Sequence, residues 1–313
     1  MAVRDIIVIG ASAGGVEGIR KVVAGLPFDL PAAVFVTMHI TGRSDGILPT
    51  LIARAGPLEA AHAIDGERIR HGRIYVAPPD YHLLLRAGHV HLSHGPRENL
   101  QRPCINAMFR SAAETYGDRV SGVVLSGLLD DGAAGLWEIQ QKNGATIVQD
   151  PDEATFRSMP DSAIRGLNVQ YIVRLAEMAP LLVKLASADF AQAVSKGSEQ
   201  SFAEETVQTC PECGGAMTST KMGRLHEFRC HIGHRFGLRT MLEEKAKNVE
   251  RVLEMALAQS EELSTLLKTA MENPDGEDGE ALRHEVRRRD AEQETLRSMS
   301  RNPKEEDLTG VRE

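Results

Sequence analysis

The 313-residue sequence predicts an α/β domain around a mostly parallel sheet, followed by a small metal-binding module and a long helix. Three observations lead to this prediction. Over about the first 185 residues, short β-branched runs alternate with helical patterns, which is typical of strand–helix–strand units. Three of the four cysteines are then packed between positions 210 and 230. Beyond them, apolar residues recur at helical spacing with charges between them.

The elements can be assigned in chain order. Strands are expected at Ile6 to Gly10, Ala32 to His39, Arg73 to Pro78, Val120 to Gly127 and Ala145 to Asp150. Helices are expected at residues 16–26, 105–117 and 175–186. We therefore divide the chain into an α/β domain (1–188), a polar linker (189–206), a zinc-ribbon-like module (207–237) and an amphipathic helical region with a charged tail (238–313).

Composition excludes several classes of protein. Lys and Arg total 36 against 44 Asp and Glu, and the resulting net charge of −8 disfavours binding to nucleic acid. No apolar run reaches the roughly 18 residues that span a bilayer, and no secretory signal is recognisable at the N-terminus. We expect a cytoplasmic protein without direct membrane insertion. In a reducing compartment, clustered thiols indicate a metal site and not a disulfide framework.

The glycine-rich turn GASAGG follows the first strand and has two interpretations. It partly matches the dinucleotide fingerprint, but Ser12 stands at the middle glycine and His39 ends the second strand where a ribose-binding acid is expected. Alternatively, Ser12 is a nucleophile exposed on a tight turn beside N–H groups that can stabilise an oxyanion. A nucleophile also needs a base and an orienting acid.

Such partners are available at the ends of neighbouring strands. His39 ends the second strand, and Asp130 and Asp131 follow the strand that begins at Val120. Carboxyl ends of parallel strands meet at one rim of the sheet, so a serine, a histidine and a carboxylate are expected to converge there as a triad. Either aspartate can instead be a turn residue or a helix cap.

Several motifs in order resemble the catalytic domain of CheB-type chemotaxis protein-glutamate methylesterases. They are VIGASAGGVEGI, the histidine after the second strand, GRIYVAPPDYHLLL, RPCINAMFRSAA, GVVLSGLLDDGAAGL and the later MP. The resemblance spans roughly residues 4–187 and implies a doubly wound, Rossmann-like fold. It implies hydrolysis of glutamate γ-methyl esters on methyl-accepting chemotaxis receptors, and deamidation of receptor glutamines, with no catalytic cofactor.

The resemblance also implies residue roles and exposes departures. Ser12 corresponds to the nucleophile, His39 to the general base and Asp131 to the orienting carboxylate, while the Leu128 backbone N–H, at a family methionine, contributes to the oxyanion hole. The first strand begins at Ile6, so we expect no phospho-receiver domain before it and no regulation by one. Residues 40–46 replace a methionine-proline segment, and Asn106 replaces an expected aspartate, which bears on substrate fit.

The cysteine–histidine cluster predicts a structural zinc site. Cys210 and Cys213 form C-x2-C, and Cys230 follows after sixteen residues with His231 and His234 nearby. We expect Cys210, Cys213, Cys230 and His234 to hold Zn²⁺, with His231 as the less suitable fourth ligand because it adjoins Cys230. A redox CxxC is the alternative, although no strand–helix context surrounds it.

Three functions from different classes remain open at this point. The first is a serine methylesterase, the second a catalytically silent receptor-binding module on the same fold, and the third a nucleotide-binding protein. The expected partner is a methyl-accepting chemotaxis receptor or a similar signalling protein. Leucines and alanines at helical spacing also fit self-association through the C-terminal helix.

Overall fold

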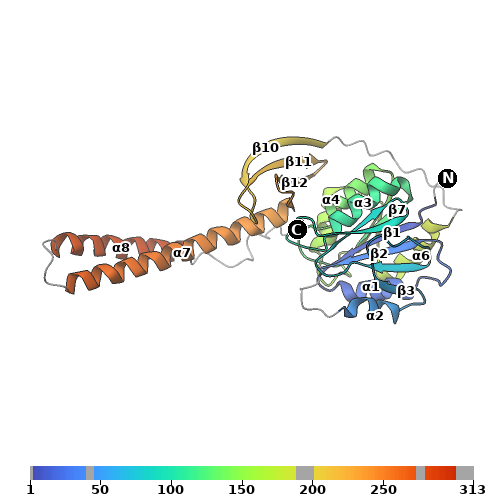
Figure 1. The fold of residues 1–313 in the computed structure, drawn as a ribbon, viewed down its shortest axis with the longest axis horizontal. Helices are drawn as coiled ribbons and strands as arrows, with labels where there is room; N and C mark the ends of the chain where they lie inside the picture. The colour runs from blue at the N-terminus through green and yellow to red at the C-terminus, as the bar shows by residue number, and fades with distance from the viewer. Residues whose placement is uncertain (1–2, 40–45, 188–200, 273–278, 301–313) are drawn as a thin grey trace. The chain divides into compact units, whose positions relative to one another are not determined.

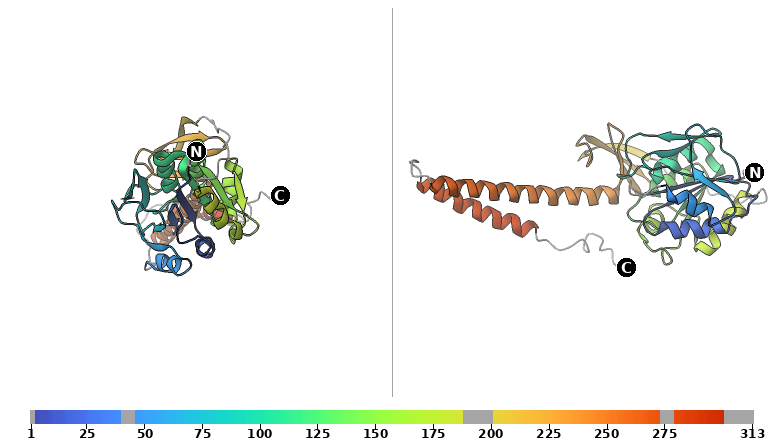
Figure 2. Two further views of the ribbon diagram at one scale, coloured as in Figure 1. Left: turned by 90° about the vertical axis from the view of Figure 1, so that its right-hand side faces the viewer. Right: turned by 60° about the horizontal axis from the view of Figure 1, so that its bottom comes forward.

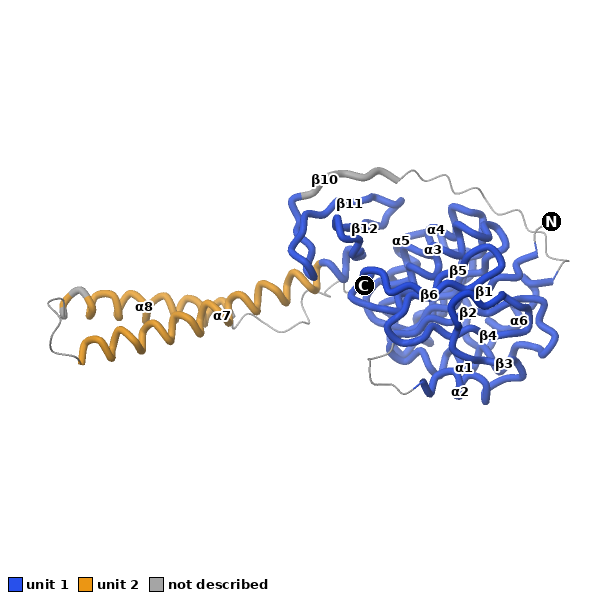
Figure 3. The backbone as a smooth tube through the Cα atoms, in the orientation of Figure 1, with its two compact units in different colours: residues 1–241 blue, residues 242–313 orange. Residues whose placement is uncertain are grey.

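The computed structural model describes residues 3–39, 46–187, 201–272 and 279–300. These residues belong to two compact units, 1–241 and 242–313 (Figure 3). Within the described part of the chain, no helix combines the length and apolar character needed to cross a membrane.

The first unit is built around a seven-stranded sheet whose neighbouring strands all run parallel. The strand order is β3-β4-β2-β1-β7-β8-β9. The bounds are β1 (Ile6–Ala11), β2 (Ala33–Met38), β3 (Glu59–His62), β4 (Arg73–Val76), β7 (Val120–Val124), β8 (Ala145–Gln149) and β9 (Tyr171–Val173). The predicted parallel sheet is confirmed, and each of the five expected strands is present. Strands β3 and β9 were not predicted.

Helices cover both faces of this sheet (Figure 1). One face packs against α1 (Gly15–Ala24), α2 (Ile47–Ala53) and α6 (Leu175–Ala186), and the other against α3 (Ile105–Tyr116), α4 (Ala133–Gln141) and α5 (Ser158–Gly166). Along β1, Ile7 and Ile9 enter one core while Ile6 and Val8 enter the other. Because both faces are buried, the central strands read as unbroken apolar runs in the sequence.

The strand order reverses at β1, which positions the site. From β1 the chain continues to β2 on one side, while β7 lies on the other side, with Ile9 between Val36 and Val123. In doubly wound sheets such a switch point opens a crevice at the carboxyl ends of the strands. The segments that follow β1, β2 and β7 therefore meet at this crevice.

Two antiparallel sheets complete the first unit. A hairpin is formed by β5 (His82–Arg86) and β6 (His89–Ser93), and a short 3-10 turn at Gly117–Arg119 precedes β7. The four-stranded sheet contains β10 (Ser201–Thr209), β11 (Ala216–Met222), β12 (Leu225–Cys230) and β13 (Arg235–Gly237). Strand β10 begins inside the segment 189–206 that we expected to be a linker; the part of that segment before position 201 lies outside the described residues.

The second unit contains most of a long helix and a second helix that packs on it (Figure 2). These are α7 (Leu238–Glu272) and α8 (Gly279–Ser300). The buried Gln293 side chain donates from Nε2 to the Ser260 carbonyl oxygen at 3.0 Å, and Arg297 pairs with Glu261 at 2.8 Å. The highly charged C-terminal segment thus forms a helix by pairing with α7, up to Ser300.

Candidate active site

Ser12 lies on the tight turn that joins β1 to α1. Its backbone N–H donates to the Ser126 carbonyl oxygen at 3.0 Å, and its own carbonyl oxygen accepts from Gly15 N–H at 2.9 Å. Gly14 has a φ of +70°, and a Cβ there would lie 2.7 Å from Thr155 Cβ. A glycine is therefore required at position 14, and the turn holds Ser12 at the carboxyl end of the central strand.

His39 follows β2 and is held to the end of β1 by its backbone. Its N–H donates to the Ala11 carbonyl oxygen at 3.2 Å. The imidazole Nδ1 lies 3.1 Å from Ser12 Oγ, and Nε2 lies 2.7 Å from Asp131 Oδ2. With its proton on Nε2, the ring donates to Asp131 and keeps a lone pair on Nδ1 for the Ser12 hydroxyl. In serine proteases the pairing is reversed, because there Nε2 contacts the serine and Nδ1 contacts the aspartate.

Asp131 is buried, with 2% of its surface exposed, and its carboxylate accepts hydrogen bonds from six donors. The donors are His39 Nε2, Asn99 Nδ2, Cys104 Sγ and the backbone N–H groups of Ile105, Asn106 and Gly132. Two of these N–H groups begin α3, where the helix dipole also favours a negative charge. The carboxylate is thereby both fixed in orientation and kept ionised.

The pKa of Asp131 reflects this environment. Burial alone would raise it, but the hydrogen bond and charge of His39, together with the Ile105 N–H and Cys104 donors, lower it to about 2. Burial also raises the pKa of the Cys104 thiol well above its usual range, so this thiol stays protonated as a donor to Asp131. Asp131 is therefore an anion at every pH at which the protein would work.

Two adjacent aspartates follow β7, and the family resemblance indicated Asp131 as the one that faces the histidine. Asp131 contacts His39, whereas Asp130 points to the start of α7, accepting from Arg239 N–H at 2.9 Å and from Thr240 Oγ1 at 2.7 Å. Both carboxylates are buried. Asp130 is thus the helix-capping aspartate, although it caps α7 and not the adjacent α4.

Asn106 stands where we expected an aspartate, and its side chain joins α3 to the start of α4. It is buried, and its Oδ1 accepts from Gly132 N–H at 3.0 Å and from Gly135 N–H at 2.8 Å. Both donors belong to the first turn of α4, where N–H groups lack partners within the helix. The asparagine that replaces the family's aspartate at position 106 therefore connects α3 to α4.

Two free backbone donors lie beside the serine. In the described part of the chain, the N–H groups of Leu128 and Ala13 have no acceptor. A Cβ on Gly127, next to Leu128, would lie 2.9 Å from Ser12 Cβ, so this loop passes directly against the nucleophile candidate. Leu128 was expected at this position, whereas Ala13 was not identified from the sequence. The residue following a nucleophile is a common oxyanion donor and could have been found on that ground.

An apolar cavity of about 170 Å³ lies between α1, the end of β2 and α2. Its lining includes Val16 on α1, Met38 directly before His39, and Leu51 on α2. The loop 40–45, which contains most of the segment that departs from the expected family pattern, lies outside the described residues.

Sequence reasoning also missed the side chain of Asn99. Its Nδ2 donates to Asp131 Oδ1 at 3.2 Å, and it is 5% exposed with a φ of +49°. Asn99 lies in the segment GPRENLQRP, and an asparagine in a loop is among the residues that tolerate such a φ. Local sequence alone does not show that it reaches Asp131, 32 positions away.

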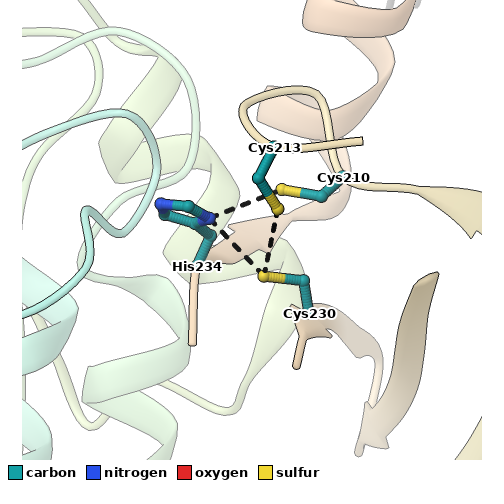
Figure 4. Close-up of side chains that lie close together, drawn as sticks. All are labelled: Cys210, Cys213, Cys230 and His234. Carbon is teal, nitrogen blue, oxygen red and sulfur yellow. Dashed lines mark hydrogen bonds between the residues drawn. The ribbon is translucent and has the colours of Figure 1, made fainter. Parts of the chain in front are cut away.

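The four candidate metal ligands converge in the C-terminal module (Figure 4). Their ligand atoms all lie within 4.8 Å of one another, with Cys213 Sγ at 3.8 Å from Cys230 Sγ and His234 Nδ1 at 3.5 Å from Cys230 Sγ. A tetrahedral ion with metal–sulfur bonds of about 2.3 Å separates two sulfurs by about 3.8 Å. The donor set and spacing therefore fit Zn²⁺.

The surroundings of this cluster are also suited to a metal. His231 lies against Gly215, outside the cluster, so His234 is the histidine that faces the thiols. The second ring nitrogen of His234 lies 3.5 Å from a carboxylate oxygen of Glu212, an arrangement that orients metal-binding histidines. Burial opposes ionisation of Cys230, but nearby backbone N–H donors lower the pKa of its thiol, which favours the metal-binding thiolate. Burial instead raises the pKa of the Cys210 thiol, so this ligand would lose its proton as it binds the metal.

Comparison with known proteins covers the α/β domain. A family model described as CheB methylesterase matches residues 7–182. A Leptospira interrogans protein, provisionally named a protein-glutamate methylesterase/protein-glutamine glutaminase, is 37% identical over 182 residues, which are 58% of this chain and 94% of that protein. Similarly named proteins from Methanosarcina mazei and Chromohalobacter salexigens are 33% and 36% identical, and the matches span 52% of each.

A solved structure matches the same part of the molecule. The crystal structure of the Thermotoga maritima CheB methylesterase catalytic domain aligns with a TM-score of 0.56 and 29% sequence identity. The alignment covers 58% of this chain and 98% of that domain. The chain thus spans nearly all of the catalytic domain but about half the length of several named relatives.

Proposed function

The chain belongs to the CheB methylesterase family, and we propose that it hydrolyses methyl esters of glutamate side chains on a methyl-accepting chemotaxis receptor or a similar signalling protein. The proposal rests on family membership and on the site at the switch point of the sheet. Its residues supply a nucleophile, a base, an orienting carboxylate and donors for an oxyanion. These are the groups that acyl transfer requires.

The proposed reaction begins with attack by Ser12. As its Oγ bonds to the ester carbonyl carbon, the hydroxyl proton passes to His39 Nδ1, and Asp131 stabilises the imidazolium that forms. The Leu128 and Ala13 N–H groups donate to the negatively charged oxygen of the tetrahedral intermediate, a contribution of about 3 kcal/mol per donor. The methoxide leaves with the proton from His39 as methanol.

The second half of the reaction restores the enzyme. Water attacks the acyl-enzyme, His39 accepts a proton from it, and the free glutamate side chain departs as Ser12 recovers its proton. The same steps deamidate a glutamine if ammonia replaces methanol as the leaving group. No step needs a metal or an organic cofactor.

The observation that supports this proposal most is the continuous hydrogen-bonded chain from Ser12 through His39 to Asp131. It connects residues separated by 27 and 92 positions, and all three follow strands that adjoin the switch point. A catalytically silent binding module would have no need for a buried carboxylate aimed at the base of an accessible serine.

Methanol release from a methylated receptor fragment tests the proposal. We expect turnover by the wild type and its loss in Ser12→Ala, with activity retained in Ser187→Ala, whose hydroxyl only contacts the Lys184 carbonyl oxygen at the end of α6. No turnover by the wild type would favour the silent module. A thermal shift on adding a dinucleotide would instead favour the nucleotide-binding alternative.

We propose separately that Cys210, Cys213, Cys230 and His234 bind one structural Zn²⁺. Four protein ligands leave no position for water, so the ion would stabilise the module without taking part in the chemistry. Metal analysis of the purified protein should give about one zinc per chain. Cys213→Ser should lose most of it, while Cys104→Ser should retain it because Cys104 lies beside Asp131.

The remaining proposals concern location and partners. We propose that the enzyme acts in the cytoplasm, where a reducing environment keeps the clustered thiols available for metal.

We also propose self-association through α7, because Val249, Val252, Leu263 and Leu266 are exposed and recur at coiled-coil spacing.

A further inference from the structure

The C-terminal module is anchored beside the triad. The module consists here of β10 to β13 and the first residues of α7, up to Met241. Strand β13 and the start of α7 contact the two loops that carry Asn99 and the Asp130–Asp131 pair. The family model matches residues 7–182, so the module lies outside the matched range and contacts residues within it.

The module fixes Asn99 at two points. The Asn99 N–H donates to the Arg235 carbonyl oxygen at 2.7 Å, and the Gly237 N–H donates to Asn99 Oδ1 at 2.8 Å. Because Gly237 occupies the amide oxygen, the Nδ2 group must face the other way, where it donates to Asp131 Oδ1 at 3.2 Å. One module N–H thus determines the orientation of a side chain that contacts the triad.

The backbone at Asn99 needs this support. Asn99 and Leu100 have φ values of +49° and +61°, which L-residues rarely adopt in succession. Such conformations persist where the surroundings hold them. Here Leu100 packs against the module's small core around Phe236, and the Arg235 carbonyl oxygen holds Asn99 N–H.

A second contact restrains the residue before Asp131. Asp130 Oδ2 accepts from Arg239 N–H, and its Oδ1 accepts from Thr240 Oγ1, at the N-terminus of α7. A Cβ on Gly237 would lie 2.3 Å from Asp130 Oδ2, so the module and this loop are in direct contact. A buried carboxylate is costly without such donors, and the loop is therefore stabilised only when the module is in place.

Charged side chains join the same surfaces. Arg110 on α3 pairs with Glu98, next to Asn99, at 3.0 Å and with Glu227 on β12 at 3.2 Å. Arg235 on β13 also pairs with Glu227, at 2.7 Å. All four side chains are largely buried, so the opposite charges compensate one another where the module meets the α/β domain.

We propose that Asn99 is a positioning residue for the Asp131 carboxylate and that the module, through Gly237 and Thr240, holds the triad in its active geometry. This inference rests on the proposed function, because it assigns the module a part in the same reaction. It predicts that the module supports catalysis in the intact chain and does not merely add a docking surface.

The test uses full-length variants and two readouts, namely turnover of a methylated receptor fragment and the rate at which a fluorophosphonate labels Ser12. The labelling amplitude counts folded sites, so a purely structural defect lowers the amplitude and leaves the rate per site unchanged. We expect Asn99→Ala to lower kcat and the labelling rate by about tenfold with KM nearly constant.

Two further substitutions separate the contributions. Asn99→Asp keeps an acceptor for Gly237 but removes the donor to Asp131, and it should also slow labelling at least about tenfold. Thr240→Val removes one contact to Asp130 and should slow labelling roughly threefold. The matched control is Thr218→Val, whose hydroxyl donates within the module to the Arg229 carbonyl oxygen and should leave the rate unchanged.

Wild-type labelling rates per site in both Asn99 variants would overturn the inference, as would equal effects of the Thr240 and Thr218 substitutions. Failure of the proposed function has a different signature, in which the wild type is labelled at Ser12 but releases no methanol. In that case the labelling rates of the variants still decide whether the module positions the triad.

Discussion

Asp131 illustrates how single residues create the site. Six donors surround one buried carboxylate, and they come from His39, from the loop at Asn99, from Cys104 and the first turn of α3, and from the Gly132 N–H before α4. Each donor favours the ionised form, and together they outweigh the cost of burial that would otherwise raise its pKa. The resulting anion orients the imidazole and stabilises it once it accepts a proton.

This environment makes protein stability depend on pH. The pKa of Asp131 is about 2 in the folded protein and about 3.9 in the unfolded chain, so its contribution is complete above pH 4 and is lost as the pH falls through 2. The difference in free energy of unfolding between wild type and Asp131→Asn should shrink by roughly 2 kcal/mol over this interval. Urea unfolding at about pH 5 and at about pH 2 measures it.

The same variant separates stability from activity. Near neutral pH, Asp131→Asn should reduce kcat by about 10⁴-fold, because an amide cannot hold the imidazole in the required tautomer. Retained turnover with a normal acid dependence of stability would show that another residue orients His39.

At the scale of elements, the site depends on how α3 and α4 begin. The first turn of α3 donates to Asp131, and the first turn of α4 donates to Asn106 on α3. Helix N-termini have N–H groups without partners inside the helix, and here two adjacent helices satisfy theirs with buried side chains. The carboxyl end of β7 is thereby tied to both helices on one face of the sheet.

Removing the Asn106 side chain should weaken this connection. Asn106→Ala leaves the Gly135 N–H without an acceptor and leaves the Gly132 N–H only its bond to Asp131, which should lower the free energy of unfolding by about 2 kcal/mol. Denaturant unfolding measures the loss. Thr115→Ala is a control on the same helix, since its hydroxyl contacts the Leu85 carbonyl oxygen away from α4 and should cost less.

At the scale of the molecule, the chain divides into two compact units. Residues 1–241 contain both the triad candidates and the candidate metal ligands. The described residues of the second unit form most of α7 and the whole of α8, which pack together, and apolar side chains are exposed along α7. This division suggests that catalysis and self-association can be separated experimentally.

Shortening the chain after Met241 tests this division. We expect the shortened protein to hydrolyse a small methyl ester within about twofold of the full-length rate, because Arg239 and Thr240 remain to contact Asp130.

The shortened protein should also be monomeric in light scattering, whereas the full chain should show association that Leu266→Glu abolishes. Association in the shortened protein would place the contact elsewhere, and a large loss of activity would mean that the first unit depends on the second.

The sequence by itself determined the parallel sheet and the positions of Ser12, His39 and the Asp130–Asp131 pair at strand ends, because periodicity and turn chemistry are local properties. The spacing of the cysteines and histidines likewise indicated which four side chains would lie together. The family resemblance indicated Asp131 as the partner of His39, and the structure places the two in contact. Only the tertiary structure decided that Asn99 joins Asp131 and that the module contacts both loops. Those contacts link residues up to 138 positions apart, and no local pattern records which buried donor meets which buried acceptor.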